Sequence, residues 1–125
     1  MLVVDDDLAT QEAIAEVLRE MGADVKVAHS AAEAMIAVEE FHPQLLLCDI
    51  AMPGEDGYDF IRRLRALGVD GGGGMPALAL TALATDDDHQ RSLAAGFQMH
   101  LSKPVDIDRL SAAVVELAAR PYASA

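Results

Sequence analysis

The chain has 125 residues, a length that suits a single domain and leaves no room for a second hydrophobic core. Just over half of its residues are apolar, as in a compact globular protein and unlike a disordered one. Its net charge of −12 argues against a nucleic-acid-binding surface and against docking on anionic lipid, because both need a basic face.

Strand-like and helix-like segments alternate along the whole chain. The expected strands are Leu2–Val4, Val25–Val27, Leu45–Cys48, Ala77–Leu80 and Met99–Leu101. Between them, apolar residues recur at the spacing of amphipathic helices, in the stripes Ile14/Val17/Leu18/Met21, Ala34/Val38/Phe41, Ile61/Leu64/Leu67 and Ile107/Leu110/Val114/Leu117. A fourth helix, roughly Asp87 to Ala95, has the weakest pattern, so we expect it to be the least tightly anchored.

Local signals mark several helix ends and one loop. Ser30 and Glu33 form a capping-box pattern at the start of the second helix. Gly22 and Gly68 are placed to end the first and third helices. Residues 70–74 include four consecutive glycines and lack the Lys-Ser/Thr of a phosphate-binding loop, which predicts a flexible surface loop.

The alternation of strands and helices predicts an α/β fold with a parallel sheet covered on both faces. The first, third and fourth strands are continuously apolar, as central strands are. The second and fifth alternate apolar and polar residues, and Lys26 suits an exposed edge. We therefore predict a flavodoxin-like (βα)5 doubly wound sheet with strand order 2-1-3-4-5, in which ligands bind beyond the carboxyl ends of the strands.

Cys48 is the only cysteine, so the chain can form no internal disulfide and suits a reducing compartment. The cysteine lies in an apolar run, where it is expected to pack as a small buried side chain. No apolar run approaches the ~20 residues of a membrane span, and no charged-then-apolar leader opens the sequence. These features predict a soluble cytoplasmic domain without membrane insertion.

Polar residues stand at the carboxyl ends of four predicted strands: Asp5 and Asp6 after the first, Asp49 after the third, Thr81 at the end of the fourth and Lys103 after the fifth. Carboxylates beside a lysine suit phosphoryl transfer with Mg²⁺, which needs an in-line nucleophile and neutralisation of phosphate charge. Asp49 can be the nucleophile and Asp5 and Asp6 the metal ligands. Lys103 can supply a charge and Thr81 a hydroxyl to the phosphate.

Four stretches, residues 2–7, 47–57, 80–82 and 101–104, resemble the response-regulator receiver family of two-component signalling, in the same order and at similar spacing. The resemblance covers essentially the whole chain. It implies that Asp49 is the residue phosphorylated, with Mg²⁺ (or Mn²⁺) as the cofactor.

The resemblance also implies roles for individual residues. Asp5, Asp6 and Asp49 would hold the metal together with the main-chain carbonyl of Ala51. Thr81, followed by Ala82, would be the switch hydroxyl.

Lys103 would bind phosphate and be joined to Pro104 by a cis bond. His100 stands where similar proteins often carry a switch aromatic. It could take that role or be a solvated edge-strand residue.

Other polar residues near these motifs have plainer interpretations. Asp7 is expected to be an electrostatic neighbour that starts a helix, and Glu55 and Asp56 are expected to be solvated. The remaining histidines are expected to be surface or capping residues: His29, His42 and His89.

In similar proteins, the positions of Ala51 and Leu83 modulate how water reaches the acyl phosphate. Both side chains are apolar here and cannot orient water, which predicts slow self-dephosphorylation. Changing Ala51 to Asn and Leu83 to Glu should shorten the lifetime of the phosphorylated state.

The sequence favours a phosphorylation-dependent switch module, residues 1–120, with a short tail at 121–125. A histidine kinase or histidine phosphotransfer domain would supply the phosphoryl group. The fourth helix, fifth strand and fifth helix would bind a partner or form a phosphorylation-dependent dimer.

Two alternatives stay open. One is a Mg²⁺-dependent phosphohydrolase with an aspartyl nucleophile, although Ala51 occupies the place of its usual second aspartate. The other is a receiver-like docking module that accepts no phosphate. The first strand begins almost at Met1, which favours a module excised from a longer protein, such as a hybrid histidine kinase, over a stand-alone regulator.

Overall fold

The computed structural model describes residues 1–52, 54–82 and 86–119. Its strands are β1 (Leu2–Val4), β2 (Lys26–Ala28), β3 (Leu46–Asp49), β4 (Ala77–Thr81) and β5 (Met99–Ser102). Its helices are α1 (Leu8–Glu20), α2 (Ala31–Phe41), α3 (Gly57–Ala66), α4 (Asp86–Ala95) and α5 (Ile107–Ala118), with a short 3₁₀ helix at Val69–Gly71. The predicted bounds of the strands differ from these by at most one residue at either end.

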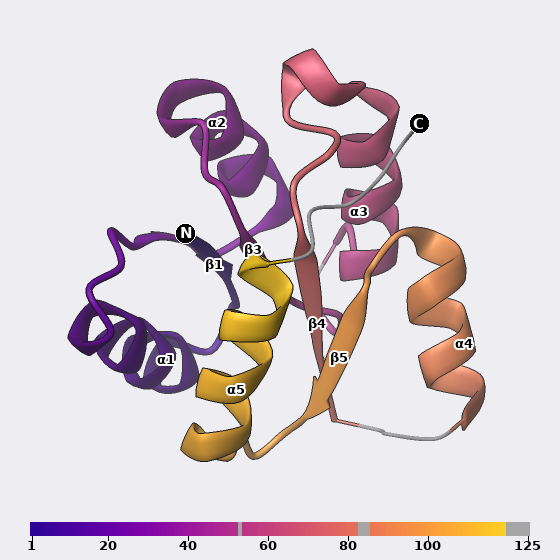
Figure 1. Ribbon diagram of the computed structural model, residues 1–125. Coiled ribbons are helices and arrows are strands. Elements are labelled where there is room, and N and C mark those ends of the chain that lie inside the picture. The colour runs from indigo at the N-terminus through magenta and orange to yellow at the C-terminus, as the bar shows by residue number, and fades with distance from the viewer. Residues whose placement is uncertain (53, 83–85, 120–125) are drawn as a thin grey trace.

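The strands form one parallel sheet in the order β2-β1-β3-β4-β5, so the predicted order is confirmed. Helices α1 and α5 cover one face and α2, α3 and α4 the other (Figure 1). The residues of β1, β3 and β4 are fully buried, whereas β2 is largely exposed and β5 half-buried. Burial on both faces thus explains the continuous apolar runs of the central strands.

Helix α4 buries only Ser92 and Ala95, fewer side chains than any other helix, in agreement with its weak apolar pattern. The predicted start of α2 is also found, since the Ser30 hydroxyl accepts a hydrogen bond from the Glu33 amide at 3.2 Å. Gly22 and Gly68 follow α1 and α3 in left-handed conformations that a glycine adopts without strain.

Residues 70–74 differ from the flexible surface loop that four glycines predicted. The chain first forms the 3₁₀ helix Val69–Gly71, and Gly73 is then buried against the end of α3. The guanidinium of Arg65 donates to the carbonyls of Gly73 and Met75, and also to that of Gly96 beyond α4. Arg65 therefore fixes this loop to α3 and to the segment before β5.

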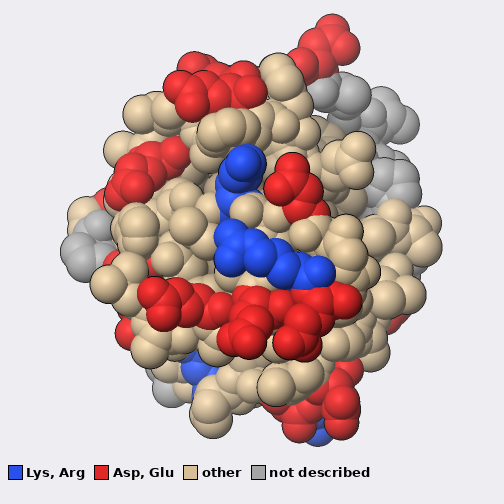
Figure 2. Space-filling model, turned by 90° about the vertical axis from the view of Figure 1, so that its left-hand side faces the viewer, with Lys and Arg blue, Asp and Glu red and all other residues tan. Residues whose placement is uncertain are grey.

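Acidic residues outnumber basic ones in the chain, 21 to 9. On the face seen in Figure 2, a short basic strip lies among acidic side chains, and no continuous basic surface is visible. None of the helices in the described ranges has the length and apolar character needed to cross a bilayer.

Candidate functional site

The parallel strands bring the predicted site residues to one edge of the sheet. Asp5 directly follows β1, Asp49 is the last residue of β3, and Thr81 is the last residue of β4. The register pairs Asp49 with Leu80 and Thr81 with Ser102, which places Lys103 just beyond the same edge. The backbone amide of Lys103 donates to the Thr81 carbonyl at 2.7 Å, so the ends of β4 and β5 remain joined.

Lys103 bridges the two buried carboxylates of this edge. Its ammonium lies 2.9 Å from Oδ2 of Asp5 and 3.3 Å from Oδ1 of Asp49. Asp5 is fully buried and Asp49 is 3% exposed. The bond between Lys103 and Pro104 is cis, as expected.

Asp6 completes a cluster of carboxylates that fits a divalent cation. It is exposed, yet one oxygen each from Asp5, Asp6 and Asp49 lie within 4.8 Å of one another. Oδ2 of Asp5 is buried and has Lys103 as an ion-pair partner, but it accepts no well-aligned hydrogen bond. A buried anionic oxygen lacking a hydrogen bond, beside two more carboxylates, is a donor set that suits a hard cation such as Mg²⁺.

Burial and like charge make Asp49 a weaker acid than usual. Desolvation and the negative charge of Asp5 raise the pKa of Asp49 to about 6, against the opposing influence of Lys103. Burial alone lowers the pKa of Lys103, but contact with Asp5 and the charge of Asp49 outweigh this and raise its pKa above the ordinary value. Lys103 is therefore charged at neutral pH, while Asp49 is ionised at a cost in free energy.

We expect Asp49→Asn to stabilise the domain at pH 7.5 when divalent cations are removed. A rise of the Asp49 pKa from 3.8 to about 6 on folding costs up to about 3 kcal/mol at neutral pH. Asparagine avoids this cost, and the pKa of about 6 already contains the favourable influence of Lys103, so a net gain of about 1–3 kcal/mol is expected.

The size of this effect on stability depends on pH. The cost is fully present above pH 6, falls as pH decreases through the folded pKa, and vanishes below 3.8, where the carboxyl is protonated in both states. Urea unfolding with EDTA at pH 7.5 and at pH 4 measures the difference. Asp70→Asn, at an exposed carboxylate far from the cluster, is the control. Equal or lower stability of Asp49→Asn at pH 7.5 would contradict this account.

The loop after β3 holds Asp49 by backbone contacts. The amide of Ala51 donates to Oδ1 of Asp49 at 3.3 Å, and the amide of Gly57 donates to the Ile50 carbonyl at 2.9 Å. A Cβ atom at Gly57 would lie 2.6 Å from the Asp49 carbonyl oxygen and 2.9 Å from Cα of Ile50. Only glycine therefore permits α3 to begin this close to the site.

Asp7 starts α1, as predicted, and does not join the cluster. It occupies the N-cap position, its amide donates to Oδ1 of Asp5 at 2.9 Å, and its carboxylate accepts from the Thr10 hydroxyl. The hydrogen bond from Thr10 lowers the pKa of Asp7. Asp7 thus orients Asp5 through the backbone.

His100 points away from the carboxylates and contacts His89 of α4. The two Nδ1 atoms lie 2.5 Å apart, and the ring centroids are 4.3 Å apart. Burial and then the charge of His89 lower the pKa of His100, while Asp88 raises it. His89 is half-buried, and its contact with His100 was not predicted from the sequence.

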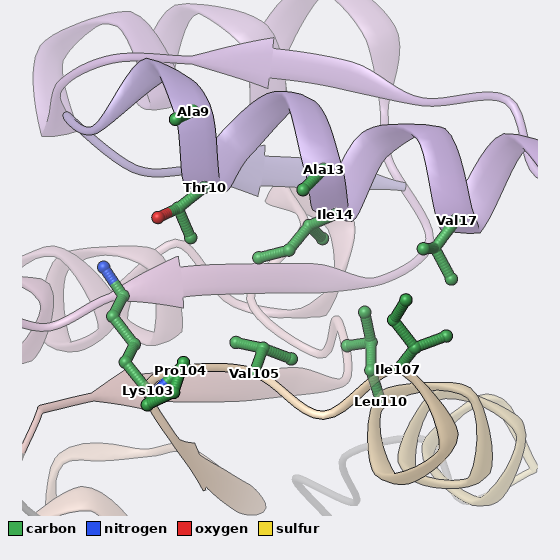
Figure 3. A pocket seen from close by; sticks show the side chains of 10 residues that line it. All are labelled: Ala9, Thr10, Ala13, Ile14, Val17, Lys103, Pro104, Val105, Ile107 and Leu110. Atoms are coloured by element: carbon green, nitrogen blue, oxygen red, sulfur yellow. The ribbon is translucent and has the colours of Figure 1, made fainter.

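Sequence reasoning also missed a groove beside the site. Figure 3 shows a groove of about 310 Å³ between α1 and α5, with Lys103 at one end. Its walls are mainly apolar side chains, including Ala13, Ile14, Val105 and Ile107. No local sequence pattern predicts this groove, because the sequences of α1 and α5 are each typical of an ordinary amphipathic helix.

The remaining predicted site positions either flank the carboxylate cluster or lie outside the described residues. Ala51 and Ala82 are exposed and flank the cluster after β3 and β4. Leu83 and the tail 121–125 lie outside the described residues, as does residue 120 at the end of the expected domain.

The family model described as "Response regulator receiver domain" matches residues 1–115 of this chain. An uncharacterised 14.6 kDa protein from the sodA1 3′ region of Leptolyngbya boryana is 45% identical over 106 residues, covering 85% of this chain and 79% of that protein. The sensor histidine kinase RcsC of Escherichia coli K12 is 34% identical over 108 residues, covering 86% of this chain. This chain spans only 11% of the length of that kinase.

Solved structures agree with this assignment. A protein from Chloroflexus aurantiacus, described as a response regulator, superposes with a TM-score of 0.89 and is 34% identical in sequence. The superposition covers 95% of this chain and 96% of the other. The similarity therefore extends over the whole sheet and its helices.

Proposed function

Because the chain belongs to the response regulator receiver domain family, we propose that it is a phosphoacceptor module of a two-component phosphorelay in which Asp49 accepts the phosphoryl group. The observation that carries the proposal is the position of Lys103, whose ammonium lies between two buried carboxylates at the ligand-binding edge of the sheet. A lysine held there can bind a phosphoryl oxygen while Asp49 reacts.

The proposed reaction is a simple displacement at phosphorus. One oxygen of the Asp49 carboxylate attacks the phosphorus of a phosphohistidine in line with the P–N bond. That bond breaks, and its electron pair stays on the imidazole nitrogen, which takes up a proton from solvent. The products are an aspartyl phosphate and a free histidine on the donor.

The other residues of the cluster prepare this step. Asp5 and Asp6, with Asp49 and the carbonyl of Ala51, would hold Mg²⁺ or Mn²⁺. A cation bound there would neutralise negative charge on the phosphoryl oxygens. Lys103 would contribute its own charge from the side of β5.

A second role of the site would be to report its phosphorylation. Thr81 is nearly buried at the end of β4, and its hydroxyl would bind a phosphoryl oxygen together with the backbone near Ala82. Movement of Thr81 would bias α4 and β5, which follow it in the chain, toward a partner-binding state. The sparse burial of α4 supports a surface whose position is easily shifted.

The partners follow from the same chemistry. A histidine kinase or a histidine phosphotransfer domain would donate the phosphoryl group, and the face of α4, β5 and α5 would bind a downstream partner or a second phosphorylated copy. No turnover of a free substrate is proposed for this domain. Hydrolysis of the aspartyl phosphate is expected to be slow, because Ala51 cannot orient water.

One experiment separates this proposal from its alternatives. The domain is incubated with Mg²⁺ and a small acyl phosphate, and its intact mass is measured alongside Asp49→Asn. A single phosphoryl adduct that needs Mg²⁺ and is lost in the variant supports the proposal. Rapid hydrolysis of phosphoesters without an adduct would indicate a phosphohydrolase, and no reaction would indicate a docking module.

A further inference from the structure

The contact between His89 and His100 lies apart from the carboxylate cluster and joins different elements. Met99 and Leu101 pack on the face of the sheet covered by α1 and α5. His100 therefore points to the opposite face, where it meets His89 of α4. Helix α4 and β5 are neighbours in the structure (Figure 1).

The two rings present ligand atoms to each other. Nδ1 of His89 and Nδ1 of His100 are 2.5 Å apart, and the rings are tilted by 48°. Imidazole nitrogen is a preferred ligand of Zn²⁺, Ni²⁺ and Cu²⁺, with metal–nitrogen distances of about 2.0–2.1 Å. Two nitrogens about 3 Å apart can share such an ion, and small rotations of these side chains would open the present contact that far.

Two imidazole nitrogens form a donor set that borderline metals accept, with water completing the coordination. This donor set differs from the all-oxygen cluster at Asp49, which suits Mg²⁺.

We propose that His89 and His100 bind a divalent transition metal ion such as Zn²⁺ or Ni²⁺ and thereby link α4 to β5. The link would matter because α4 has the fewest buried side chains of the five helices. An ion that binds only the folded arrangement stabilises it and restrains the helix. The proposal concerns the unphosphorylated domain and does not depend on phosphorylation of Asp49.

Calorimetric titration of the domain with ZnCl₂ and NiCl₂, in excess Mg²⁺ to occupy the carboxylate cluster, tests the proposal. His89→Gln and His100→Gln should each weaken binding at one site by at least tenfold. The matched controls are His29→Gln and His42→Gln, at exposed histidines elsewhere on the chain, and they should bind like the unaltered domain. Affinity should rise from Mn²⁺ to Ni²⁺, as nitrogen ligands require.

A second measurement locates the ion. Long-range ¹H–¹⁵N spectra of the imidazole rings should show Zn²⁺-dependent shifts at Nδ1 of both His89 and His100. Binding that persists unchanged in His89→Gln, or shifts confined to His29 and His42, would overturn the proposal. So would the absence of binding at millimolar Zn²⁺, which would leave the two rings joined only by a hydrogen bond.

Discussion

Lys103→Met is expected to slow phosphorylation of Asp49 by an acyl phosphate by about 10²–10³-fold, the cost typical of removing one preorganised group that stabilises transition-state charge. Methionine keeps most of the length of the side chain but removes the ammonium that lies 3.3 Å from Asp49. The rate is obtained from intact mass spectra recorded over time with excess donor and Mg²⁺.

The chain provides a matched control for this substitution. Lys26 is the only other lysine and lies exposed on the edge strand β2, so Lys26→Met removes the same charge far from the site. We expect its phosphorylation rate to stay within about twofold of the unaltered domain. A Lys103→Met variant that is folded by circular dichroism and reacts at the unaltered rate would rule out Lys103 as the phosphate-binding residue.

Asp5→Asn is expected to weaken Mg²⁺ binding by about 100-fold or more. Even neighbours that only orient a metal ligand typically contribute 10–100-fold to affinity, and Asp5 would be a direct ligand. Its carboxylate is fully buried in the cluster with Asp6 and Asp49, and asparagine removes its negative charge. Isothermal titration with MgCl₂ measures the change.

The same replacement two residues later tests whether the effect is local. Asp7 is exposed and hydrogen-bonded to Thr10 at the start of α1, so Asp7→Asn should change Mg²⁺ affinity by less than threefold. If both variants lost affinity equally, the cation would be attracted by the general negative charge of the loop and would not be held by Asp5.

The architecture could be predicted because burial leaves a periodic signature in each element. Central strands covered on both faces are continuously apolar and edge strands alternate, which distinguished the three central strands from the two edge strands. The site could be predicted for a related reason. Asp5, Asp49, Thr81 and Lys103 each directly end or follow a strand, and the carboxyl ends of parallel strands meet at one edge.

Contacts between distant side chains left no such signature. His89 and His100 belong to separate elements, and neither lies in a periodic pattern that shows which neighbour it faces. The same holds for Arg65, whose hydrogen bonds to Gly73 and Gly96 order a loop that composition alone made look flexible. These contacts depend on how α3, α4 and β5 pack together, which only the three-dimensional arrangement reveals.

The most direct test of the central claim is to locate the phosphoryl group chemically. After reaction with an acyl phosphate and Mg²⁺, borohydride reduces an aspartyl phosphate to homoserine, which peptide mass spectrometry assigns to one position. We predict homoserine at position 49 alone, and none when Mg²⁺ is omitted. Homoserine at Asp5, Asp6 or another acidic residue, or phosphate retained on a histidine, would contradict the assignment of Asp49 as the phosphoacceptor.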